Sequence, residues 1–213
     1  MLKKIYQYSK HLFSSSGNQH LTVTPQSPTG LTRIIIGNGV AGVEAAKTLR
    51  KLDPDCRIIM ISAESLLHWS RPALMYIFME ELSFADSCRY PKEWFAKKRI
   101  ELVHDQVIAV DRSEQKLSLK TGPILSYEQL LVACGSQPKT LKQVPMNLDG
   151  VFGFYHLQDG EKLKKKTQQA QQALIIGGGL IAVELAEILL HQGLKVTIVT
   201  QDPFFCGSYC VNC

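Results

Sequence analysis

The sequence predicts an α/β fold with parallel sheets, because two similar segments appear in it at a wide spacing. Each segment is a short aliphatic run, a glycine turn and an apolar helical stretch, and the two occupy residues 34–46 (IIIGNGVAGVEAA) and 174–186 (LIIGGGLIAVELA). Aliphatic runs of this length are typical of strands buried on both faces of a parallel sheet. Strands that alternate with helices indicate β–α–β units. The sequence therefore predicts two Rossmann-like units in series.

Glycines at fixed positions predict what the two turns bind. In such a turn the first glycine permits the tight bend, the second lets the backbone approach a pyrophosphate, and a third small residue lets helix and strand pack closely. The phosphates then lie at the helix N-terminus, which favours anions. The candidate residues are Gly37, Asn38, Gly39, Val40, Ala41 and Gly42 in the first segment, and Gly177, Gly179 and Ala182 in the second. Two such motifs, which also match at Glu44 and Glu184, predict two dinucleotide sites.

An acidic residue follows the second predicted strand of the first unit. A helix is expected over residues 39–51, ending before Pro54, and a strand over residues 57–61. Glu64 follows this strand, 22 residues past Gly42. A carboxylate at this place can accept both hydrogen bonds of a ribose hydroxyl pair. The alternative is an acid in an exposed loop.

The next segment contains an arginine and a histidine with open roles. Arg71 directly precedes a proline. It is either an ordinary surface residue or a residue whose guanidinium donates hydrogen bonds to phosphate or to the flavin edge. His68 is a generic acid–base candidate, or a structural or merely exposed histidine. A helical stretch is expected to reach Glu81, and Trp94 and Phe95 are expected on the buried face of a short helix.

A run of short strands follows and predicts a small antiparallel meander over residues 101–103, 106–110 and 116–119. The segment 127–134 is an apolar strand that ends in small residues, which admit close approach of a ligand. The expected organisation is an N-terminal extension over residues 1–30, a first dinucleotide-binding domain over 31–140, a connector over 141–172 and a partial second domain over 173–213. The extension is expected to be flexible.

Composition narrows the classes of function. The net charge is a modest +5, and the lysines of residues 162–166 fit a solvated helix face, a linker or a patch for an anionic partner. Aromatic residues do not interleave with them, so nucleic-acid binding is not predicted. No apolar run is long enough to span a membrane, and a cytoplasmic protein is expected. The six cysteines predict neither a disulfide framework nor a metal site. A metal site at the C-terminal tail, which holds three of the cysteines, would need a fourth ligand from elsewhere in the chain.

The order of motifs resembles the FAD-dependent pyridine-nucleotide oxidoreductases that carry two dinucleotide domains. The segment Ser70–Leu74 is similar to the branch that contains ferredoxin and rubredoxin reductases, apoptosis-inducing factor and the NADH modules of nitrite reductases. The resemblance covers roughly residues 32–202. Its most specific elements are the first glycine motif, the Ser-Arg-Pro turn, the strand that ends at Ala133-Cys134-Gly135 and the second glycine motif, in that order.

This resemblance implies a role for each candidate residue. The first motif would cradle the FAD pyrophosphate, and the second would bind NAD(P)H. The remaining assignments are Glu64 to the adenosine ribose, Arg71 to the flavin or phosphates, Val107 to the adenine through its backbone, Ala133 to Gly135 to the cofactor wall, Glu184 to the nicotinamide end and Asp202 to the second nucleotide. No catalytic side chain is implied, because the flavin carries the chemistry.

Departures from the family pattern shape the expected function. Residues 64–76 contain no cysteine, so electrons would leave the flavin for an external acceptor, a small protein or molecule. The family usually has threonine where Cys134 stands. Thr200, Gln201 and Asp202 follow the last strand with no basic residue, which favours NADH.

The chain also ends early, since family members continue well beyond this point, and a truncated form of such an enzyme is expected. The main hypothesis is a flavoprotein oxidoreductase that passes hydride from NAD(P)H to FAD. The alternative is a dinucleotide-binding or interaction protein without turnover. A homodimer is one way to cover the apolar faces of an incomplete second unit.

Overall fold

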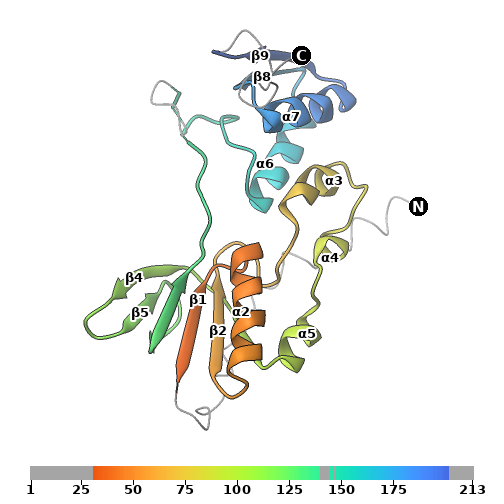
Figure 1. Cartoon of the computed structure of the whole chain (residues 1–213). Coiled ribbons are helices and arrows are strands. Elements are labelled where there is room, and N and C mark those ends of the chain that lie inside the picture. The colour runs from red at the N-terminus through yellow and green to blue at the C-terminus, as the bar shows by residue number, and fades with distance from the viewer. Residues whose placement is uncertain (1–30, 140–143, 146, 202–213) are drawn as a thin grey trace.

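The structure, a computed structural model, describes residues 31–139, 144–145 and 147–201. The predicted extension over residues 1–30, the cysteine-bearing tail and Asp202 lie outside the described residues. Within them the α/β prediction is confirmed, because the fold contains parallel and small antiparallel sheets with helices. Figure 1 shows two lobes joined by the extended segment that follows strand β7.

The first lobe is built on a four-stranded parallel sheet. Its strands lie in the order β3-β2-β1-β7 and span Ile100–His104, Arg57–Ser62, Thr32–Ile36 and Gln129–Val132. The aliphatic run of β1 puts Ile34 and Ile35 at 0% exposure, one on each face of the sheet. This is why the run has no alternation of polar and apolar residues.

Each face of that sheet has its own cover. Helices α2 (Val40–Leu52) and α5 (Lys92–Lys97) close one face around a core that includes Ile35, Val43, Met60 and Phe95. The other face packs against the antiparallel strands β4 (Val107–Asp111), β5 (Lys116–Leu119) and β6 (Ile124–Ser126), as Figure 1 shows in part. The result is three layers with a separate hydrophobic core between each pair.

Three details differ from the sequence-based expectations. Residues 101–103 were expected in the meander, but they belong to β3, which pairs in parallel with β2 through Ile59↔Glu101 and Ile61↔Val103. A short apolar run has the same pattern whichever strand it pairs with, so the sequence alone could not assign the partner. Strand β6 was not expected, and the segment predicted as a connector contains helix α6 (Leu157–Thr167). The four lysines of this helix make the segment polar in sequence, although one face of the helix buries Leu157, Gly160 and Leu163.

The second lobe contains the second glycine motif. Strands β8 (Gln172–Ile176) and β9 (Lys195–Val199) pair in parallel, and helix α7 (Leu180–His191) connects them. The short helix α3 (Leu74–Phe78) comes from the first half of the sequence but packs here, since Phe78 joins a core with Leu163, Ile175 and Leu189. The opposite face of the β8–β9 pair leaves Leu174 and Val199 61% and 51% exposed.

The remaining short elements join the two lobes. A single 3-10 turn, η1 (Arg71–Ala73), leads into α3, and α4 (Phe84–Ser87) returns the chain toward α5. Cys56, Cys88 and Cys134 are free thiols, and no metal-ligating cluster occurs among the described residues. Burial raises the pKa of the Cys88 thiol, so this group is not an activated nucleophile. No helix in the described part of the chain is long and apolar enough to cross a membrane.

Candidate functional site

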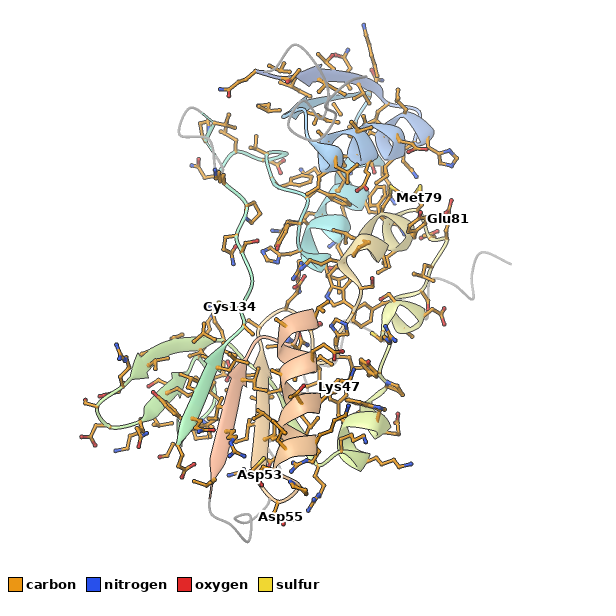
Figure 2. All side chains as sticks on the ribbon, in the orientation of Figure 1. Lys47, Asp53, Asp55, Met79, Glu81 and Cys134 are labelled. Atoms are coloured by element: carbon orange, nitrogen blue, oxygen red, sulfur yellow. The ribbon has the colours of Figure 1, made fainter. Side chains whose placement is uncertain are left out.

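Residues predicted for the first dinucleotide site lie along the carboxyl edge of the four-stranded parallel sheet. Gly37 follows β1, Glu64 follows β2, Val107 lies three residues beyond β3, and Ala133 follows β7. The chain runs from β1 to β2 on one side, whereas β7 lies on the other, so the strand order reverses between β1 and β7. Ligands of open parallel sheets bind at such a point. Figure 2 shows Cys134 at this edge, and Asp53 and Asp55 at the far end of α2.

The three glycines of the first motif have different reasons to be glycine. Gly37 has φ +109°, and a Cβ there would lie 2.2 Å from the Ala133 carbonyl oxygen. A Cβ on Gly42 would lie 2.0 Å from the Gly37 oxygen. These two positions are therefore fixed by the fold itself. Gly39 differs, because it has φ −66° and no atom lies within 4 Å of its ideal Cβ.

The open space at Gly39 lies at the start of helix α2. Gly39 is the N-cap, no side chain caps the helix, and its first turn contains no acidic residue. The first N–H groups of a helix have no partner within the helix, and the helix dipole adds a partial positive charge there. An exposed, uncapped helix N-terminus behind a small residue fits a diphosphate group.

The second motif repeats this geometry in the other lobe. Gly179 is the N-cap of α7, which also lacks a side-chain cap and an acidic first turn, and no atom lies within 4 Å of its ideal Cβ. Gly177 has φ +134°, and Ala182 is buried against the strand, as Gly42 is in the first motif. A Cβ on Gly178 would lie 2.6 Å from the Thr200 hydroxyl, so the end of β9 packs on this loop.

Asn38 anchors the first glycine loop to groups in the interior of the protein. Its side-chain amide donates to the Ser65 carbonyl at 2.8 Å, and its own carbonyl lies 2.9 Å from the His68 ring nitrogen Nδ1. All three residues are buried. Since the Asn38 side chain is used within the protein, only its main chain faces the open space of the loop.

Glu64 is only 15% exposed and is already engaged with three neighbours, one of which is the His156 ring nitrogen Nδ1 at 3.6 Å. Its carboxylate pairs with the Arg71 guanidinium at 2.5 Å and accepts a hydrogen bond from the Leu157 N–H at 2.9 Å. Because Leu157 begins helix α6, Glu64 connects the first dinucleotide site to the second lobe. Any ribose at Glu64 would share this carboxylate with Arg71 and the helix.

Arg71 lies in an aromatic setting that the sequence reasoning missed. Its guanidinium stacks over the Tyr155 ring at 4.6 Å and lies 5.4 Å from the Trp69 ring, while it donates to the Tyr155 carbonyl at 2.9 Å. Cation–π contacts of this kind hold a guanidinium in place. Asp159 caps the start of α6 by accepting a hydrogen bond from the His156 N–H at 2.8 Å. Because His156 is not a usual N-cap residue, no sequence signal marked Tyr155 in advance.

The remaining candidates lie on β4, just after β7 and on α7. Val107 begins β4 at a β-bulge, a position where the backbone is available near a sheet edge. Ala133 donates its N–H to the Ile36 carbonyl at 2.8 Å and so joins β7 to the glycine turn, and Gly135 follows with φ +71°. In α7, the half-buried Glu184 has no hydrogen bond or ion pair within the described residues. Its counterpart Glu44 pairs with Lys47, whose hydrogen bond lowers the pKa of that carboxyl.

Comparisons with known proteins decide the family. A protein-family model described as pyridine nucleotide-disulphide oxidoreductase matches residues 32–210 of this chain. The chain belongs to this family. The resemblance seen in the sequence is therefore confirmed, and so is the two-motif α/β fold.

Relatives in this family include redox-protein reductases. The NADH-rubredoxin oxidoreductase of Clostridium acetobutylicum is 33% identical over 167 residues, which are 78% of this chain and 43% of that protein. The benzene 1,2-dioxygenase system ferredoxin–NAD(+) reductase subunit of Pseudomonas putida is also 33% identical, over 78% of this chain and 40% of its own length. The chain thus spans less than half the length of these relatives.

Solved structures agree with the sequence relatives. A ferredoxin reductase from Rhodopseudomonas palustris matches with a TM-score of 0.76 at 28% identity, and the match covers 84% of this chain and 45% of that chain. The Clostridium acetobutylicum NADH:rubredoxin oxidoreductase structure matches with a TM-score of 0.70 at 31% identity, over 79% and 44% of the two chains.

Proposed function

We propose that the first glycine loop binds FAD, that the second binds NADH, and that the chain serves a flavoprotein oxidoreductase. In this reaction hydride passes from NADH to the flavin, and electrons continue to a small external redox protein. The relatives named for rubredoxin and ferredoxin support an acceptor of that kind. The single observation that carries the proposal is the pair of uncapped helix N-termini, each behind a glycine with open space at its Cβ position.

The residues of this chain would bind and orient the two nucleotides. The N-termini of α2 and α7 would offer N–H donors to the two diphosphates. Arg71, held by Glu64 after β2 and by the Tyr155 ring, would offer a cation on the side of the site where β2 ends. FAD, when bound, supplies the redox chemistry, so no side chain needs to donate or accept a proton in the hydride step.

A flavin titration tests the proposal directly. Because the diphosphate cradle at Gly39 is complete in this chain, we expect saturable FAD binding with a Kd in the range of about 1–50 µM, corresponding to roughly −6 to −8 kcal/mol. The measurement is the change in flavin fluorescence as FAD is mixed with the purified chain, with riboflavin, which lacks a diphosphate, as the control ligand. A chain that is colourless after purification and shows no saturable response would refute the proposal and favour a protein without turnover.

The second site is expected to prefer NADH to NADPH by at least about tenfold. No arginine or lysine occurs among residues 200–213, so the segment after β9 offers no cation to the extra phosphate, and Asp202 would repel it. Competition binding of the two nucleotides against a fluorescent analogue measures the ratio. Gln201→Arg should narrow the preference, because it introduces a cation at the end of β9. Tighter binding of NADPH by the unmodified chain would contradict this prediction.

A further inference from the structure

A buried polar cluster lies directly behind the first glycine loop. It consists of Asn38, Ser65 and His68, which are 9%, 7% and 8% exposed. The Asn38 amide donates to the Ser65 carbonyl, and the Ser65 hydroxyl donates to the Leu67 carbonyl, each at 2.8 Å. The His68 ring nitrogen Nδ1 lies 2.9 Å from the Asn38 carbonyl oxygen. Hydrogen bonds in both directions therefore link the glycine loop to the loop that follows β2, including a longer one of 3.4 Å from the Asn38 amide to the Leu66 carbonyl.

The partner of His68 determines which nitrogen carries the proton. A main-chain carbonyl oxygen only accepts hydrogen bonds, so Nδ1 of His68 must be the donor. This holds for the neutral Nδ1–H tautomer and for the imidazolium ion alike. The Tyr90 ring lies on one side of the imidazole, with 6.3 Å between the two ring centroids. The histidine is thus fixed by its packing as well as by its hydrogen bond.

The orientation of one peptide plane follows from this bond. The peptide between Asn38 and Gly39 is trans and planar, so its C=O and N–H point in opposite directions. His68 holds the C=O toward the interior, and the Gly39 N–H therefore points away from His68. No protein acceptor for that N–H occurs among the described residues, and Gly39 is exposed at the start of α2.

We propose that His68 is a positioning residue of the first dinucleotide site. By holding the Asn38 carbonyl, it aims the Gly39 N–H at the diphosphate of the bound cofactor. This inference rests on the proposed function, since it requires that a diphosphate binds the first loop. The hydrogen bond would be formed before the cofactor arrives, so the donor costs no rearrangement on binding.

The second glycine loop offers an internal comparison. Gly178 stands where Asn38 stands in the first loop, and the Thr200 side chain packs on it instead. The second loop therefore has no side-chain amide or imidazole in this place. A variant at His68 should affect the first site and leave the second unchanged, whereas a general loss of folding would affect both.

Two substitutions separate positioning from packing. His68→Asn keeps an N–H donor near the place of Nδ1, while His68→Leu keeps volume but removes the donor. The full chain is titrated with FAD, and separately with NADH, and its thermal unfolding is followed in parallel. We expect His68→Leu to weaken FAD binding about tenfold and His68→Asn to retain it within about threefold, the range of a single hydrogen bond. NADH affinity should stay the same in both variants.

The outcomes distinguish the inference from the proposed function. An unmodified chain that binds no FAD would overturn both. Normal FAD binding by His68→Leu, or equal weakening of FAD and NADH, would overturn the positioning role alone. If His68→Leu does not fold, NMR of the unmodified chain still decides, because the inference requires an Nδ1–H ring and a shift of the Gly39 amide resonance when FAD is added. An Nε2–H neutral ring, or an unchanged Gly39 resonance, would overturn it.

Discussion

Replacing Gly39 by valine is expected to weaken FAD binding at least about a hundredfold, while the free energy of unfolding falls by only about 1 kcal/mol. The loss of binding follows from the open space at this residue, which a valine side chain would fill where the diphosphate must approach. The small change in stability follows from its φ of −66°, which any residue adopts, and from the absence of protein atoms within 4 Å. The expected loss in the free energy of unfolding therefore comes mainly from valine being a poorer N-cap residue than glycine.

Gly179→Val is the matched control, because the second loop has the same geometry. Gly179 is also an N-cap in extended conformation with open space at its Cβ position. FAD titration should show the defect only in the Gly39 variant, and NADH titration should show it only in the Gly179 variant. If each variant lost both nucleotides, or if neither lost one, the assignment of one nucleotide to each loop would be wrong.

The glycine pattern also shows what could be predicted from sequence. The pattern located both loops, both helices and the flanking strands correctly, because glycine turns and aliphatic runs are local signals. It could not show that Gly37 and Gly42 are required by the protein itself. For Gly37 the requirement comes from the Ala133 carbonyl, which lies about a hundred residues away in the sequence and arrives through the pairing of β7 with β1. For Gly42 it comes from the nearby Gly37 carbonyl oxygen.

Long-range contacts explain the other missed features. The sequence placed Glu64 and Arg71 in the same region, but their ion pair and its link to Leu157 depend on the packing of α6 against the first lobe. The parallel pairing of β3 was missed for the same reason. A histidine of open role, His68, gained a specific partner only when the loop after β2 folded against the glycine loop.

Arg50 is a further residue that no sequence pattern singles out. It lies in the last turn of α2, where a basic residue is common. In the structure its guanidinium donates to four main-chain carbonyls at 2.8 Å, those of Lys98 and Arg99 at the end of α5 and of Pro54 and Cys56 in the turn before β2. A longer bond of 3.4 Å reaches the Asp53 carbonyl. One side chain thus joins the ends of both helices on that face of the sheet to the start of a central strand.

Arg50→Met is expected to lower the free energy of unfolding by about 3 kcal/mol, since hydrogen bonds from charged donors contribute roughly 1.5–3 kcal/mol each and are not additive. Lys51→Met is the matched control, because it removes the neighbouring cation from the same helix turn. Lys51 is exposed and makes no hydrogen bond or ion pair within the described residues, so the effect should stay within about 0.5 kcal/mol. Urea unfolding followed by circular dichroism compares the two variants. FAD affinity should not change in the folded protein, because Arg50 lies near Asp53, at the end of α2 far from the glycine loop. Equal destabilisation by both substitutions would show that the four carbonyl contacts contribute nothing beyond the charge of the helix terminus.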